Sequence, residues 1–138
     1  MFLTIRCGTG MTKMRFNKDA FGIILFTTLT GNNIIRRVNM VLDTGATYSM
    51  MPWFIAEELG YDPASTKKRI AIQTANGQIH VPMITIDSVR VIGKTVEHCD
   101  MLVHNLPESS RVDGLIGLNF LKQFKLTIDF KEGILTLS

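Results

Sequence analysis

One acidic residue of the sequence stands where an apolar strand would open into a tight turn. The segment reads Val41-Leu42-Asp43-Thr44-Gly45-Ala46-Thr47, so that two apolar residues run directly into the acid. A carboxyl group in this position can act as a general acid or base, and the glycine after it lets a backbone approach closely. The same residue types are common in ordinary turns, so the tripeptide alone favours a structural turn over a catalytic one.

A second segment, about 70 residues downstream, strengthens the catalytic interpretation. Two large aliphatic residues precede a glycine in Gly114-Leu115-Ile116-Gly117, and a short helical pattern follows in Leu118-Asn119-Phe120-Leu121. Between the two segments, Thr74-Ala75-Asn76-Gly77 marks a hairpin. An Asp-Thr-Gly-Ala run, a hairpin flap, two aliphatic residues with glycine and a short helix, in this order, resemble the retropepsins, the aspartic proteases of the retroviral class. With the ending Ile128-Asp129-Phe130 and Gly133-Ile134-Leu135, the sequence looks most like bacterial retropepsin-like proteins.

The resemblance spans residues 20–137 and implies a fold, an activity and a site. The implied fold is mainly β, a closed barrel-like acid protease fold with one or two short helices, and the implied activity is that of an aspartic endopeptidase without a metal or cofactor. Asp43 would be the catalytic acid and base, Thr44 would lock paired loops through its hydroxyl, and Gly45 would let the substrate backbone approach. The expected substrate-binding residues follow the motif or form the flap tip: Ala46, Ala75, Asn76 and Gly77.

The sequence carries one half of a catalytic pair. Peptide hydrolysis of this type needs two carboxyl groups that share a proton, one to accept a proton from water and one to polarise the scissile carbonyl. Of seven aspartates, only Asp43 is followed by Thr-Gly, whereas Asp113 belongs to the supporting segment. An isologous two-fold homodimer would supply the identical group, and the resemblance implies the same. The predicted active unit is therefore a homodimer that acts on a polypeptide substrate.

Short runs of β-branched and apolar residues, separated by turn residues, predict an all-β domain. The strongest turn signals are Gly31-Asn32-Asn33 and Ala75-Asn76-Gly77, each between two extended runs. Residues 1–19 carry less pattern and are predicted to be an N-terminal extension, either an extra strand or a flexible arm, before a single domain at 20–138. The predicted strands cover residues 20–30, 34–42, 69–74, 78–86, 89–92, 96–103, 125–130 and 134–137, and the predicted helices cover 52–59 and 118–124.

Composition argues against several other classes of protein. The 138 residues are enough for one domain with its own core, and no apolar run has the length of a membrane span. The net charge is +3, but the basic residues are neither concentrated nor interleaved with aromatic residues, so we expect no nucleic-acid partner. Cys7 and Cys99 are predicted to be free thiols in a reducing compartment, which favours a cytoplasmic location.

Other functions remain as alternatives. The chain could be a non-catalytic dimerisation or peptide-binding module of the same fold that keeps Asp43. A phosphatase with an aspartyl nucleophile is disfavoured, because the sequence has no Gly-rich phosphate loop and no acid cluster. A thiol protease built from His98 and Cys99 is disfavoured because adjacent residues of a strand face opposite sides. These two residues and His104 match no standard zinc spacing, so no metal site is expected.

Overall fold

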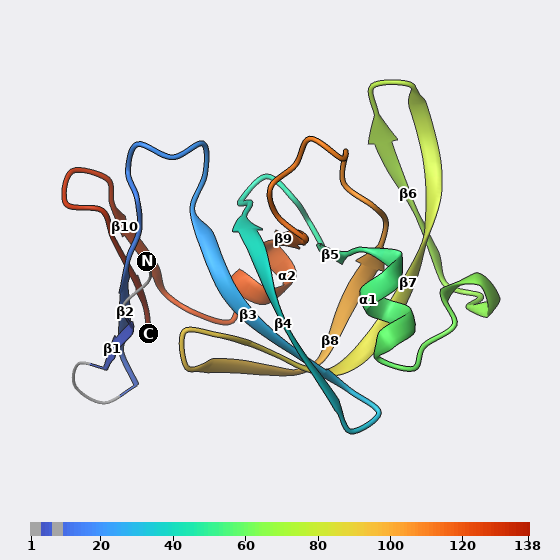
Figure 1. Cartoon of the computed structure of the whole chain (residues 1–138), viewed down its shortest axis with the longest axis horizontal. Helices are drawn as coiled ribbons and strands as arrows, with labels where there is room; N and C mark the ends of the chain where they lie inside the picture. The colour runs from blue at the N-terminus through green and yellow to red at the C-terminus, as the bar shows by residue number, and fades with distance from the viewer. Residues whose placement is uncertain (1–3, 7–9) are drawn as a thin grey trace.

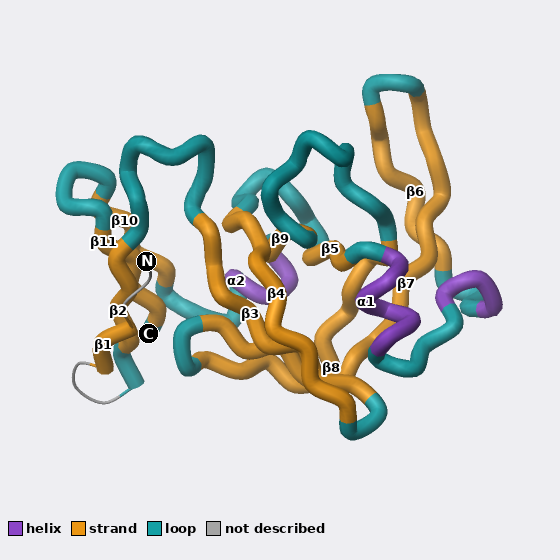
Figure 2. Tube along the Cα trace, in the orientation of Figure 1, coloured by secondary structure: helices purple, strands orange, loops and turns teal. Residues whose placement is uncertain are grey.

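The computed structural model describes residues 4–6 and 10–138 (Figure 1). Strands and turns dominate this part of the chain, beside two short α-helices and one 3₁₀ turn (Figure 2). None of the described helices is long and apolar enough to cross a membrane. In chain order the elements are β1 (Thr4–Arg6), β2 (Thr12–Arg15), β3 (Ile24–Gly31), β4 (Ile34–Leu42), β5 (Ser49–Met51), α1 (Trp53–Glu58), η1 (Pro63–Ser65), β6 (Arg69–Thr74), β7 (Gly77–Val91), β8 (Lys94–Val103), β9 (Gly114–Ile116), α2 (Leu118–Leu121), β10 (Leu126–Asp129) and β11 (Ile134–Leu137).

Six of the described strands close into a barrel. Their order is β3-β4-β9-β5-β8-β7, and the barrel closes because β7 also pairs with β3, with Val91 opposite Thr27. The side chains that fill it include Leu25, Met40 and Ile116, each at most 1% exposed. Strand β6 pairs only with β7, and the β6–β7 hairpin projects from the barrel (Figure 1). This arrangement confirms the mainly β, closed barrel-like fold with two short helices.

Local turn chemistry accounts for the hairpins. Asn32 and Asn33 have φ angles of 52° and 63°, the left-handed values that a two-residue type I′ turn requires, and they connect β3 to β4. Thr74 and Gly77 face each other across the end of the β6–β7 hairpin, where the Thr74 hydroxyl donates a hydrogen bond of 2.8 Å to the Gly77 carbonyl. The strands predicted at 34–42, 69–74 and 134–137 have the bounds of β4, β6 and β11.

The prediction of two separate strands at 78–86 and 89–92 was wrong. Strand β7 runs without a break for 15 residues, from the end of the β6–β7 hairpin to Val91, where it pairs with β3 and closes the barrel. Ser88 stays extended because it pairs with Glu97 of β8 on one side and with Thr30 of β3 on the other. Pairing on both edges therefore overrides the weak turn tendency of Asp87 and Ser88.

The N-terminal segment contributes strands to a second sheet. That sheet has the order β1-β2-β11-β10, and Met14 of β2 lies opposite Leu135 of β11. Met14 is 1% exposed and packs in the main hydrophobic core, as does Phe16. Of the two alternatives for residues 1–19, the described part therefore contains strands, β1 and β2. Cys7 lies outside the described residues, and the division at residue 19 stays a prediction.

The packing of β2 yields a stability prediction. Met14→Ala should lower the free energy of unfolding by about 2–5 kcal/mol, because it leaves a cavity under the second sheet. The matched control is Arg15→Ala on the same strand, where the side chain is exposed and the expected change is within about 0.5 kcal/mol. Urea unfolding followed by tryptophan fluorescence measures both, and equal small effects would show that β2 adds nothing to the core.

Candidate active site

Asp43 lies directly after β4, where the barrel places two chain segments side by side. Strand β9 runs parallel to β4, with Ile116 beside Leu42, and the Asp43 amide donates a hydrogen bond of 2.9 Å to the Ile116 carbonyl. The Gly45 amide donates to Oδ1 of Asp43 at 2.9 Å, so the carboxylate folds over its own turn. Its other oxygen, Oδ2, accepts no hydrogen bond within the described residues, and the side chain is partly exposed. One oxygen is thus held in place and the other is free.

The start of α2 fixes the rest of this turn. The Leu118 amide donates to the Ala46 carbonyl at 2.8 Å, and the Asn119 amide donates to the Thr47 carbonyl at 3.1 Å. Gly117 permits this approach, because a Cβ there would lie 2.8 Å from the Ala46 carbonyl oxygen and 2.7 Å from that of Tyr48. The segment around Asp43 and the segment from Gly114 to Leu121 are therefore in direct contact.

A buried polar network holds the same turn from the interior of the protein. Ser49, 0% exposed, donates from its amide and from its hydroxyl to Oδ1 of Asn119, at 2.8 and 2.9 Å. Its hydroxyl oxygen also accepts a hydrogen bond of 2.9 Å from the Gly117 amide. Asn119 completes the network by donating from Nδ2 to the Asp100 carbonyl at 2.7 Å. Strand β5, helix α2 and strand β8 are joined by these two side chains.

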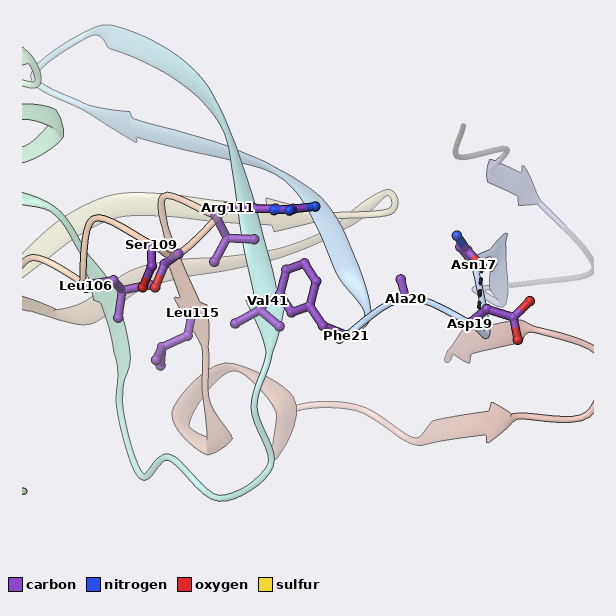
Figure 3. A pocket seen from close by; sticks show the side chains of 11 residues that line it. Asn17, Asp19, Ala20, Phe21, Val41, Leu106, Ser109, Arg111 and Leu115 are labelled. Atoms are coloured by element: carbon purple, nitrogen blue, oxygen red, sulfur yellow. Dashed lines mark hydrogen bonds between the residues drawn. The ribbon is translucent and has the colours of Figure 1, made fainter.

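Two pockets share Leu115 as a lining residue, and the Asp43 turn lines one of them, while Val41, two residues before Asp43, lines the other. The smaller, about 520 Å³, lies between the turn and the flap strand β6. The larger, about 930 Å³, lies between the segment before β3 and the loop before β9 (Figure 3). The smaller is lined by Gly45, Ala46, Thr47, Tyr48, Met50, Ile70, Ala71, Ile72, Gln73, Leu102 and Leu115.

Of the four predicted substrate-binding residues, one lines a pocket and three lie at the tip of the flap. Ala46 lines the smaller pocket beside the flap strand, and its role in binding substrate stays a prediction. Ala75, Asn76 and Gly77 form the flap tip but line neither of these pockets, and no atom lies within 4 Å of the position of a Cβ on Gly77. Ile70 and Ile72 line the pocket instead. Their alternation with exposed residues along β6 is the signal that could have pointed to them.

Comparison with known proteins agrees with this geometry. Residues 30–123 match the model of the family described as "gag-polyprotein putative aspartyl protease". The chain belongs to this family. It is also similar to the crystal structure of a retropepsin-like aspartic protease from Rickettsia conorii, with 25% sequence identity, a TM-score of 0.71, and coverage of 99% of this chain and 94% of that chain. No curated protein matches the chain.

Family membership confirms the resemblance to retropepsin-like aspartic proteases, and a protease family implies a peptide substrate. The roles of Asp43, Thr44 and Gly45 stay predictions, to which the structure adds their positions. Thr44 is exposed at the turn, and its hydroxyl makes no hydrogen bond within the described residues.

Cys99 is a buried structural residue in this retropepsin-like fold. Its side chain is 3% exposed, and burial, together with the negative charge of Asp100, raises the pKa of the thiol to about 12. The thiol is therefore protonated at neutral pH and cannot act as the nucleophile of a thiol protease. Across residues 4–6 and 10–138, no three His, Cys, Asp or Glu side chains are grouped so that they could hold a metal ion.

The buried network predicts the effect of removing one hydroxyl. Ser49→Ala should destabilise the protein by about 1–3 kcal/mol, because the buried Gly117 amide loses its acceptor. Ser65→Ala is the matched control, since the Ser65 hydroxyl makes only an exposed local bond to the Asp62 carbonyl. Thermal unfolding of both variants tests this, and similar melting temperatures for the two would contradict it.

The environment of Cys99 predicts slow thiol chemistry. In a Cys7→Ser background, Cys99 should not react measurably with a disulfide reagent at about pH 8, because the folded protein carries almost no thiolate. Full reaction is expected once urea unfolds the chain. The absorbance of the released thiol reports both phases, and rapid reaction of the folded protein would show that Cys99 is accessible.

Proposed function

We propose that this chain is one half of a homodimeric aspartic endopeptidase, in which two Asp43 carboxylates activate the water that cleaves a peptide bond. The observation that carries the proposal is the geometry of Asp43. Its carboxylate is oriented by the Gly45 amide, its Oδ2 accepts no hydrogen bond within the described residues, and its turn lines the smaller pocket. This is the arrangement that a general acid and base needs next to a bound peptide.

The need for a second copy follows from the remaining acids. Asp113, in the supporting segment, accepts a hydrogen bond of 2.9 Å from the Asn39 amide, which holds its carboxylate against the backbone of β4. Asn39 lies four residues before Asp43, about 13 Å away at the rise of a strand, so Asp113 cannot share a proton with Asp43. A two-fold axis beside the turn would bring in the identical carboxylate. The exposed Thr44 hydroxyl, which has no partner among residues 4–6 and 10–138 of its own chain, supports an interaction across that axis.

The chemistry then follows from one proton shared by two carboxyl groups. Two like charges in contact cannot both be ionised at low cost, so one Asp43 is charged and the other protonated. The charged one takes a proton from water as the water oxygen bonds to the scissile carbonyl carbon, and the protonated one donates its proton to the carbonyl oxygen. The Asp43 that took the proton from water then passes it to the amide nitrogen, and the C–N bond breaks. At the same time the other Asp43 takes back a hydroxyl proton from the tetrahedral intermediate, so the pair again holds one proton. The expected products are a free carboxyl group and a free amine.

The pockets indicate how a substrate would lie. An extended peptide passing over the Asp43 turn would place side chains in the two pockets, with Leu115 between them. The apolar face of β6, with Ile70 and Ile72, would cover it, and the flap tip at Ala75, Asn76 and Gly77 would close toward the partner. We place the enzyme in the cytoplasm, which the unpaired thiol of Cys99 supports.

Substitution of the acid tests the function. Asp43→Asn should reduce cleavage of unfolded casein, between about pH 4 and 7, to below about one thousandth of the wild-type rate, because the amide cannot take a proton from water. The control is Asp62→Asn, an exposed acid that lines neither pocket. A folded, dimeric wild-type protein that cleaves no unfolded protein or peptide would favour the non-catalytic module.

Mixing the subunits tests the shared site. Wild-type and Asp43→Asn chains are unfolded together in equal amounts and refolded. The mixture should have about one quarter of the activity of pure wild-type protein at the same total protein concentration. This value follows because only dimers with two aspartates are active. Mixing with Asp62→Asn should leave the full activity. A residual activity of about one half would mean that each chain works alone.

A further inference from the structure

The larger pocket has an apolar floor and is lined by two charged residues, Asp19 and Arg111. Val41 and Leu115 form the floor, and they are the paired residues of β4 and β9 that lie next to the Asp43 turn. Phe21, 69% exposed, stands at one side of the pocket, and the loop that contains Leu106 and Arg111 forms the other (Figure 3). A side chain entering this pocket from the Asp43 turn would meet mostly apolar surface.

Arg111 is the charge that faces such a side chain. Among the residues that line the two pockets, Arg111 and Asp19 carry a full charge at neutral pH. Asp19 lies at the far end, beyond Ala20, and Figure 3 shows its carboxylate pointing away from Phe21. The guanidinium of Arg111 instead reaches across the pocket on the side of Phe21 (Figure 3).

The guanidinium of Arg111 has no partner within the described residues. It makes no hydrogen bond or ion pair there, in contrast to Arg36, which contacts Glu58 at 2.7 Å. The acid nearest to it in sequence, Asp113, is already bonded to the Asn39 amide. A free guanidinium at the rim of an apolar pocket presents a fork of donors that matches a carboxylate.

We propose that Arg111 determines specificity, by selecting substrates that carry glutamate or aspartate two positions from an apolar residue at the cleavage site. This inference rests on the proposed function. In an extended peptide, residues two apart point to the same face, so an apolar side chain in the pocket places the acidic one at the rim. Because this rim is exposed to solvent, the selection is modest, about three- to fivefold.

Matched peptides test the proposal. Two peptides that differ only in Glu or Gln, two positions from the apolar residue, are compared for each side of the scissile bond. Wild type should cleave the Glu peptide with a kcat/KM about three- to fivefold higher than the Gln peptide, and the ratio should fall toward one at high salt. Arg111→Gln should abolish the ratio, and Arg111→Glu should favour a Lys peptide. Arg37→Gln, an exposed arginine of β4 that lines neither pocket, should keep the wild-type ratio.

The same peptides separate the two ways in which the account can fail. Binding of fluorescent peptides to Asp43→Asn, measured by anisotropy, should show the Glu preference and its loss when Arg111→Gln is added. Equal kcat/KM for the Glu and Gln peptides, or a preference that survives Arg111→Gln, would overturn the role of Arg111. Binding with the Arg111-dependent preference but no cleavage by wild type would instead retain Arg111 and contradict the protease. Equal binding of both peptides, without cleavage, would contradict both.

Discussion

The pairing of β4 with β9 is the contact on which the site depends. It sets Leu42 beside Ile116 and continues as the hydrogen bond from the Asp43 amide to the Ile116 carbonyl. One residue further, Gly117 lets the start of α2 reach the carbonyls of Ala46 and Thr47. Segments about 70 residues apart are thereby brought together, and the Asp43 turn is fixed before any substrate is present.

The interactions of this turn are divided between its two sides. On the inner side, backbone amides, the Ser49 hydroxyl and the Asn119 side chain satisfy one another in a buried network. On the outer side, Oδ2 of Asp43 and the Thr44 hydroxyl have no partner within the described residues. A turn held rigidly from within, with free polar groups outside, is well suited to receive both a peptide and an identical turn from a second copy.

The sequence predicted the elements with local signals and missed those that depend on distant pairing. Strands β4 and β6 could be predicted because turn residues mark their ends. The type I′ turn could be predicted because Asn32 and Asn33 are residue types that adopt positive φ angles. Strands β5 and β9 have three residues each, too short for any periodicity, and exist because they pair with β8 and β4. Strand β2 forms because it pairs with β11 near the other end of the sequence, with Met14 opposite Leu135.

The site was predicted to a similar extent. The tight turn at Asp43 was predicted from residue type, because an acid followed by Thr-Gly after an apolar strand is a local sequence pattern, whereas the catalytic role of Asp43 stays a prediction. The residues around the turn were not predicted: Ser49 and Asn119 meet across the fold, and Arg111 comes from a loop whose position only tertiary structure defines. The flap tip was expected to bind substrate, which stays a prediction, whereas the pocket beside the Asp43 turn is lined by residues 70–73 of the flap strand β6.

The distance between two Asp43 carboxylates in the assembled protein tests the central claim most directly. A crystal structure of the protein with a bound, uncleavable peptide should show a two-fold axis beside the Asp43 turn, with oxygens of the two carboxyl groups about 3 Å apart. It should also show the Thr44 hydroxyls bonded to the partner. A peptide bound to a single chain, or to a dimer whose Asp43 carboxylates lie more than about 10 Å apart, would contradict the account, because the two groups could not share a proton.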